Sequence, residues 1–458
     1  MAKNKKYNLD TSPIGRLVIQ MTAPVMLAGL LNTSYGFVDM IFASRLGGVQ
    51  VASIAFISPL FIMLKSVNRG IAKGGVSVIA KLIGQKDHAQ AAAYATQLRL
   101  MIIAFALFFS TAGIFFSHSL LSILQVPEPL FDQSLIYTRI MFFSLPATAI
   151  VGLYLTLFLS QGKMNITTQI SLLGLMSNIA LNSVSIFVLK LGIEGLAYAT
   201  LATQFIQAIV IIILYHQTKH AFNLSWRSSP AFGVGRIRGH LLNVGAPLSF
   251  SLASTHFGNL LINVIIAPMG YEVVAAFAIG NRINSLMFMP TKQMGQGLVP
   301  LIAHNWGAKA LDRVRRTIKL SIWYALVLGI LGGIFIQLVK WPLGSFLTQG
   351  EEDIFRHVIN YVSLVGWTVI AWALFNLLQS IFEGFQKTSF TFWTNVFRLW
   401  GLRIPGVFLL SYLFPSLQEY AVWYTMFASN IITLLFAFVF FAIKIPAFLN
   451  SDKSWSLA

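Results

Sequence analysis

The feature that most constrains this chain is a succession of apolar runs, each long enough to cross a lipid bilayer as one helix. About 20 apolar residues suffice for one crossing, and only short polar or glycine-containing breaks separate the runs. The predicted spans are 16–43, 51–82, 90–117, 129–160, 165–189, 194–216, 240–268, 271–303, 314–340, 354–384, 389–413 and 419–445. The sequence therefore predicts an all-α integral membrane protein with twelve transmembrane helices.

The composition fits a chain that lies mostly within a bilayer. Hydrophobic residues make up 56% of the sequence and charged residues 10%, against about 25% charged in soluble globular proteins. The net charge of +18 would suit a nucleic-acid binder, but no soluble stretch is long enough to carry a basic face. The absence of cysteine excludes disulfides and thiolate metal sites, and the sequence contains no recognisable catalytic constellation. We therefore expect no enzyme activity, no cofactor, no metal and no nucleic-acid partner.

The distribution of basic residues predicts how the spans are oriented. If the N-terminus is cytoplasmic, nearly all loop lysines and arginines fall on the cytoplasmic side, as the positive-inside rule requires. Only Arg45, Lys190, Lys340 and Arg356 fall on the other side. No cleavable signal follows the basic N-terminal segment, so we expect the first span to be retained. The prediction is a multi-pass protein of the cytoplasmic (inner) membrane with both termini in the cytoplasm.

The chain also repeats itself with a period of about 220 residues. A shift of 223 positions superposes the beginning of the first half on the beginning of the second half without a gap. The matched pairs include Ala23 with Ala246, Pro24 with Pro247, Gly47 with Gly270, Gly74 with Gly297 and, at a shift of 224, Tyr137 with Tyr361 and Lys163 with Lys387. Matched glycines and prolines at one fixed offset are harder to obtain by chance than matched apolar residues.

Each repeat holds six spans, an even number, so both halves enter the membrane in the same direction. The predicted domains are a cytoplasmic N-terminal segment at 1–15, an N-lobe at 16–216, a cytoplasmic linker at 217–239, a C-lobe at 240–445 and a cytoplasmic tail at 446–458. Two six-helix bundles can rock against each other around a central cavity, which is how a carrier works. An ion channel is disfavoured, because the sequence has no selectivity-filter loop and no ring of acids.

Two stretches carry a resemblance to a known family. The first is PVMLAGLLNTSYGFVDMIFASRLGG, followed by SPLF, and the second is GNRINSLMFMPTKQMGQGLVPLIAHNWGAK. Both resemble helices of the multidrug and toxic compound extrusion (MATE) family, and the likeness runs from about residue 15 to about residue 445. The resemblance implies two pseudo-symmetric lobes, a V-shaped molecule, and export driven by inward flow of protons or sodium. It implies structural or gating roles for Pro24, Arg282, Pro290, Gly295, Gly297 and Arg398.

One acid lies inside the first span. Asp39 stands in an apolar run, where an ionised carboxylate is costly, and the resemblance places it at the family's first-helix acid implicated in cation coupling. Asn178 and Asn182 lie one turn apart on the fifth span, and the sixth span offers the hydroxyls of Thr200 and Thr203. Many family members carry an aspartate where this chain has Asn182, so its set of sodium ligands is weaker.

A lone carboxylate in a low dielectric binds a proton more readily than one in water. We therefore predict proton coupling through Asp39, with sodium as the alternative ion. The plain structural alternatives are a carboxylate that reaches the headgroups from a helix end, and asparagines that only join helices by hydrogen bonds.

Cations within the spans form a second candidate site. Lys65, Arg69 and Lys73 are spaced four residues apart on the second span, so they form one stripe, and the repeat superposes Arg69 on Lys292. We predict that these four cations line an electropositive cavity for anionic or zwitterionic cargo; the alternative is contact with lipid headgroups. The other residues predicted to line the cavity are Tyr35, Phe257, Phe288 and Glu383.

Together these features predict a secondary active efflux transporter that exports small amphipathic organic compounds by alternating access. A flippase for a lipid-linked or phosphate-bearing precursor is the alternative, and an ion channel is the least favoured class. The expected partners are a small-molecule substrate and the phospholipid bilayer. We expect a monomer whose transport is driven by a proton or sodium gradient.

Overall fold

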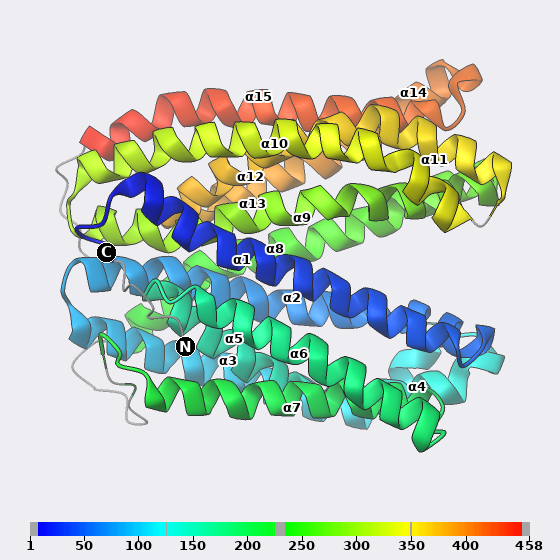
Figure 1. Cartoon of the computed structure of the whole chain (residues 1–458), viewed down its shortest axis with the longest axis horizontal. Helices are drawn as coiled ribbons and strands as arrows, with labels where there is room; N and C mark the ends of the chain where they lie inside the picture. The colour runs from blue at the N-terminus through cyan, green and yellow to red at the C-terminus, as the bar shows by residue number, and fades with distance from the viewer. Residues whose placement is uncertain (1–7, 125, 223, 225–233, 349, 451–458) are drawn as a thin grey trace. The chain divides into compact units, whose positions relative to one another are not determined.

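The protein is described by a computed structural model (Figure 1). The described residues are 8–124, 126–222, 224, 234–348 and 350–450. The residues outside the described ranges are 1–7 of the predicted N-terminal segment, 125 of the N-lobe, 223 and 225–233 of the linker, 349 of the C-lobe and 451–458 of the tail. Every regular element within the described ranges is a helix. The predicted all-α fold is confirmed.

The chain forms two compact units, which divide inside two helices. Unit 2 is Leu27–Leu252, and unit 1 joins the chain up to Met26 with the chain from Ala253 onward. Helix α1 (Ile14–Ser44) and helix α8 (Val234–Ile266) each contribute one part to each unit.

The remaining elements fall wholly within one unit. Unit 2 contains α2 (Gly48–Gly84), α3 (His88–Ile123), α4 (Glu128–Phe143), α5 (Leu145–Ser160), α6 (Asn165–Ser183), the π-helix η1 (Val184–Val188) and α7 (Ile193–Gln217). Unit 1 contains η3 (Ala267–Met269), α9 (Tyr271–Gly307), α10 (Leu311–Thr348), α11 (Glu352–Val365), η4 (Gly366–Thr368), α12 (Val369–Gly384), α13 (Thr388–Val396), the π-helix η5 (Phe397–Arg403), α14 (Ile404–Leu413), η6 (Pro415–Leu417) and α15 (Tyr420–Asn450).

Eleven helical segments of the described chain are long and apolar enough to cross a membrane. The predicted span 51–82 corresponds to α2, which is continuous over 37 residues and carries the three cations of the predicted stripe. The predicted span 129–160 is divided at Ser144 into α4 and α5, and Pro146 lies in the first turn of α5, where its missing N–H is tolerated.

The predicted repeat is visible in the backbone itself. Gly47 and Gly270 precede α2 and α9 with φ angles of 119° and 113°, a region open to glycine but strained for other residues. Lys86 and Lys309, also 223 positions apart, both adopt left-handed conformations, with φ angles of 61° and 57°. The two halves of the chain therefore turn in the same way at equivalent positions.

Close helix contacts explain why the units divide within α1 and α8. A Cβ atom added to Gly297 would lie 2.7 Å from the carbonyl oxygen of Met21, so α9 packs closely against the first half of α1. At the equivalent position, a Cβ atom on Gly74 would lie 3.1 Å from Val244 and 3.2 Å from Gly245, so α2 packs against the first half of α8. Relative to the predicted lobes at 16–216 and 240–445, the compact units therefore exchange the first halves of these two helices.

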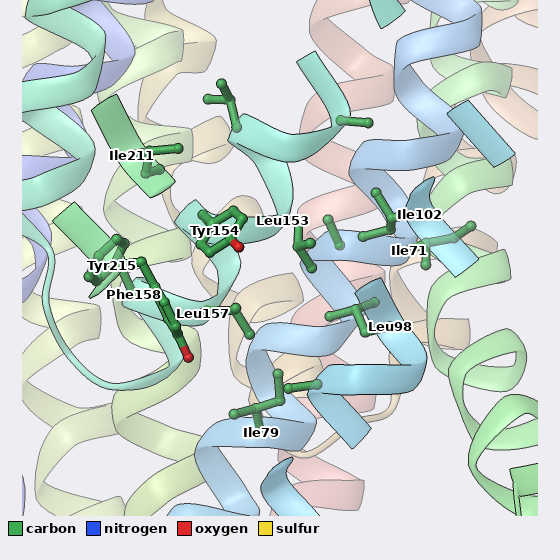
Figure 2. Close-up of a cluster of buried hydrophobic side chains, with 14 of the residues drawn as sticks. Ile71, Ile79, Leu98, Ile102, Leu153, Tyr154, Leu157, Phe158, Ile211 and Tyr215 are labelled. Atoms are coloured by element: carbon green, nitrogen blue, oxygen red, sulfur yellow. The ribbon is translucent and has the colours of Figure 1, made fainter. Parts of the chain in front are cut away.

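Each unit has its own apolar core. Figure 2 shows the core of unit 2, where Leu98, Leu153 and Leu157 are fully buried. The Tyr215 ring lies edge-on to the Tyr154 ring in this core, with the ring centroids 5.0 Å apart. In a membrane, such dense packing of helices replaces the hydrophobic effect as the main source of stability.

The core of unit 1 is built around the fully buried ring of Trp423. This indole stacks on Phe277 with a centroid distance of 5.9 Å and meets the edge of Tyr361 at 4.7 Å. These contacts join α9, α11 and α15, and they fix the position of the Tyr361 ring.

Candidate functional site

The structure of unit 2 brings Asp39 together with both predicted asparagines. Asn178 and Asn182 each donate a hydrogen bond from Nδ2 to Oδ1 of Asp39, at 3.0 Å in both cases. Asn182 Nδ2 also donates to Oδ1 of Asn178 at 3.1 Å. The two asparagines lie one turn apart on α6 and are fully buried, whereas Asp39 on α1 is half-buried. Two amide donors directed at one oxygen stabilise a carboxylate.

Hydroxyl groups surround this cluster. The hydroxyl of Tyr35, one turn before Asp39, faces Asn178, Thr200 and Thr203 without making a hydrogen bond of good geometry. The Thr203 hydroxyl and Oδ1 of Asn182 are buried and have no hydrogen-bond partner among the described residues. Unsatisfied buried oxygens beside a carboxylate are available to bind a proton, a cation or a water molecule. Tyr35, predicted as a cavity residue, therefore lies beside this polar cluster around Asp39.

Tyr137 on α4 is a member of this cluster that the sequence interpretation missed. Its half-buried hydroxyl lies close enough to Asp39 and Tyr35 to interact with them electrostatically. The sequence did contain one signal for Tyr137, its match with Tyr361 in the repeat. A tyrosine retained in both halves indicates a structural or functional role at that position.

The basic stripe lies on α2 of the same unit. Lys65 and Lys73 are half-buried and Arg69 is exposed. Lys65 is close enough to Asp39 for Coulombic attraction and to Arg69 for repulsion, but Lys65 and Asp39 make no ion pair within 4 Å. The Lys65 end of the stripe therefore lies near Asp39.

The remaining predicted cavity residues belong to unit 1. Lys292 on α9 is half-buried, and its predicted place beside the stripe stays a prediction. Phe257 is 46% exposed and stacks on Trp400, with ring centroids 5.8 Å apart. Phe288 stacks on Trp372 at 5.5 Å. Both phenylalanines are therefore held by a tryptophan of the same unit.

Two charged residues of unit 1 are almost completely buried. Glu383 is 2% exposed and accepts a hydrogen bond of 3.1 Å from the hydroxyl of Thr391. Arg398 is 4% exposed, and its guanidinium carbon lies 4.7 Å from the centre of the Trp372 ring, a cation–π contact. Arg398 therefore fixes the ring on which Phe288 stacks. Arg282, the other arginine implied by the resemblance, is half-buried on α9.

The remaining residues implied by the resemblance act on helix geometry and packing. Pro24 and Pro290 lie inside α1 and α9, where each removes one backbone hydrogen bond. A Cβ atom on Gly295 would lie 2.4 Å from the Ser380 hydroxyl, so this glycine allows α9 and α12 to approach each other. Gly297 does the same between α9 and α1.

Within the described part of the chain, no group of three or more His, Asp or Glu residues could hold a metal ion.

A duplicated bundle of membrane-crossing helices, with a polar cluster built around one acid, defines the class of a membrane carrier. The MatE family model matches residues 24–184 and 247–409, one match in each half of the chain. The chain therefore belongs to the MatE family of multidrug efflux transporters.

Relatives with assigned names agree with this assignment. The chain is 25% identical to the probable multidrug resistance protein YoeA of Bacillus subtilis strain 168 over 431 residues, 91% of each chain. It is 23% identical to an FAD transporter of Shewanella oneidensis over 421 residues, which are 89% of this chain and 90% of the transporter. A crystal structure of a MATE transporter in complex with MaL6 matches the fold with a TM-score of 0.92 at 19% identity, covering 98% of this chain and 100% of the other.

Proposed function

We propose that this transporter exports small amphipathic organic compounds by alternating access, in exchange for protons that bind at Asp39. The observation that carries the proposal is the pair of hydrogen bonds from Asn178 and Asn182 to Asp39. Two donors on one carboxylate oxygen stabilise the deprotonated form of Asp39. The second carboxylate oxygen can then take up a proton. The alternative coupling ion is sodium.

The hydrogen-bond pattern favours a proton over sodium. A hard cation needs a cage of oxygen ligands. Asn178 and Asn182 present N–H groups to Asp39, and Oδ1 of Asn178 already accepts a hydrogen bond. The amides would have to turn before their oxygens could surround a sodium ion, whereas protonation of Asp39 requires no such rearrangement.

The cargo we propose is anionic or zwitterionic and carries phosphate. Lys65, Arg69 and Lys73 form one basic stripe on α2, and ammonium and guanidinium groups bind phosphate through charge-assisted hydrogen bonds. The similarity to an FAD transporter supports the same cargo class, because that relative's namesake cargo carries phosphate groups. Two hydroxyl residues remain proposed members of the cation-coupling site, Thr200 and Thr203. Four further residues remain proposed to line the substrate cavity, namely Lys292, Phe257, Phe288 and Glu383.

Efflux from proteoliposomes tests the proposal. A flavin dinucleotide and a cationic dye are loaded separately, and efflux is followed under an imposed proton gradient or an imposed sodium gradient. We expect proton-driven efflux of the flavin dinucleotide, and loss of that efflux in the triple variant Lys65→Ala, Arg69→Ala, Lys73→Ala. The matched control removes three exposed cations of α10: Arg315→Ala, Arg316→Ala, Lys319→Ala. Equal export of the cationic dye by all three proteins, with no flavin export, would contradict the cargo assignment.

The second candidate function is a flippase for a lipid-linked or phosphate-bearing precursor, because the same basic stripe would suit its headgroup. A headgroup-specific flipping assay separates the two: flipping without efflux of any soluble compound would favour the flippase. Steady ionic currents in single-channel recordings would instead favour a channel. We further propose that the protein acts as a monomer in the cytoplasmic membrane, with both termini in the cytoplasm.

A further inference from the structure

Unit 1 contains a buried polar cluster centred on Arg403. Arg403 lies at the end of the π-helix η5 and is 4% exposed. Its Nε donates to the Ser429 hydroxyl at 3.1 Å, and its Nη2 donates to Oδ1 of Asn430 at 2.7 Å. Asn430 extends this hydrogen-bond network, because its Nδ2 donates to the Thr368 hydroxyl at 3.0 Å. The residues that hold this guanidinium are therefore all neutral.

The cluster has a positive charge and no matching negative one. Within the described ranges, no carboxylate forms an ion pair with Arg403, nor with the nearby Arg398. Arg398 precedes Arg403 by five residues on η5, and each guanidinium feels the repulsion of the other. A buried guanidinium usually has an anionic partner, since removing it from water is expensive.

A second group in the cluster lacks a partner. Asn284 on α9 is fully buried, and neither its Nδ2 nor its Oδ1 makes a hydrogen bond of good geometry to any described residue. It lies beside η4, because a Cβ atom on Gly366 would be 3.5 Å from Oδ1 of Asn284. A buried amide without a partner has lost its hydration without replacement, and a bound species would supply the missing partner.

Tyr361 joins these two groups. Its hydroxyl donates to Oδ1 of Asn281 at 2.7 Å, and it lies close enough to Asn284 and Arg403 to interact with both. In the repeat, Tyr361 corresponds to Tyr137, which lies close enough to Asp39 in unit 2 to interact with it electrostatically. The duplicated module therefore places a carboxylate beside this tyrosine in one half and a guanidinium in the other.

We infer that the cluster of Arg403, Asn284 and Tyr361 binds a small monovalent anion of halide size, such as chloride. The positive guanidinium supplies the charge, and the unsatisfied Nδ2 of Asn284 supplies a further donor. We propose a small anion rather than an organic one because Asn284, Tyr361 and Thr368 have no exposed surface. This anion is distinct from the cargo and from the coupling ion at Asp39, so the inference stands independently of the proposed transport function.

Thermal unfolding of the purified protein tests the inference. The midpoint Tm is measured in sodium chloride and in sodium gluconate at the same ionic strength. A ligand that binds only the native state raises its stability by RT ln(1 + [L]/Kd). We expect chloride to raise Tm saturably, by about 3 °C. Equal Tm values in the two salts would overturn the inference.

One substitution places the missing charge inside the cluster. In Asn284→Asp, the new carboxylate takes the place of the anion, so we expect the chloride-dependent shift to be lost and the Tm in gluconate to rise. The control Asn360→Asp introduces the same change on α11 next to Tyr361 but on another face of the helix, and it should keep the full shift. A full chloride shift in Asn284→Asp would contradict the inference.

A measurement on the unmodified protein covers the case in which Asn284→Asp fails to fold. Bromide replaces chloride and can be located in crystals by its anomalous scattering. We expect a bromide peak between Arg403 and Asn284. Fully exchanged crystals that show no peak in the cluster would overturn the inference.

Discussion

The Nδ2 atom of Asn182 lies 3.0 Å from Oδ1 of Asp39 and 3.1 Å from Oδ1 of Asn178. One amide nitrogen is thus shared between a carboxylate and a second amide. Because the position directly contacts the acid, the residue there decides how many negative charges the cluster holds. Asparagine leaves the cluster with a single carboxylate.

A second carboxylate at this position should change the coupling ion. In Asn182→Asp, two carboxylates about 3 Å apart cannot both stay ionised unless a cation lies between them. We expect the variant to show efflux stimulated by sodium, which the unmodified protein lacks. The measurement is the initial rate of efflux against sodium concentration at constant pH.

The matched control for this variant is Asn165→Asp, the same change at an exposed position of α6. It should leave the sodium dependence unchanged. If Asn182→Asp also transports without any response to sodium, the position does not control the choice of ion.

The close approach of α9 to α1 predicts a large effect of one methyl group. The Cβ atom of Gly297→Ala would lie 2.7 Å from a backbone oxygen, so the helices must move apart, at a cost of about 1–3 kcal/mol. We expect a lowered Tm. Gly152→Ala on α5 has no atom within 4 Å of its new Cβ and should leave Tm unchanged or slightly raised. Equal Tm values for the two variants would contradict the packing described for unit 1.

The segment before α1 is held by hydrogen bonds from α10. Arg313 donates from Nη2 to the carbonyl oxygens of Leu9 and Ser12, at 2.9 and 3.0 Å. Arg313→Ala removes both bonds, so we expect a protease to cleave this segment several times faster than in the unmodified protein.

The control for this experiment is Arg315→Ala. Arg315 has a half-exposed side chain and an ion pair of 3.4 Å to Asp312, so its loss should change cleavage little. Identical cleavage rates for the two variants would show that the contacts of Arg313 do not hold the segment.

Much of the fold could be predicted from the sequence because a helix that crosses a bilayer must be long and apolar. Hydrophobic length predicts the spans, and the spacing of Asn178 and Asn182 predicts that they share one face of a helix. The exchange of the first halves of α1 and α8 was not predicted, since an apolar helix half does not reveal by its composition which bundle it packs against. Gly74 and Gly297 lie at the close helix contacts, but a glycine in the sequence does not indicate which helix it will contact.

The surroundings of Arg403 were also beyond prediction. The residue was recognisable as a cation in an apolar span, but its direct partners lie on α15, and Asn430 in turn bonds Thr368 on η4. Only tertiary structure brings Ser429, Asn430 and Thr368 to it. The missing hydrogen bonds of the Asn284 amide could not be predicted either, because they depend on which side chains pack around it.

The most direct test of the account is a count of the protons that move with cargo. In proteoliposomes that contain a pH-sensitive dye, a gradient of cargo should drive protons in the opposite direction through the unmodified protein and through the control Asp132→Asn, an exposed acid of α4. In Asp39→Asn the same cargo gradient should move no protons. Proton movement in Asp39→Asn equal to that of the unmodified protein would contradict the central claim that Asp39 carries the coupling proton.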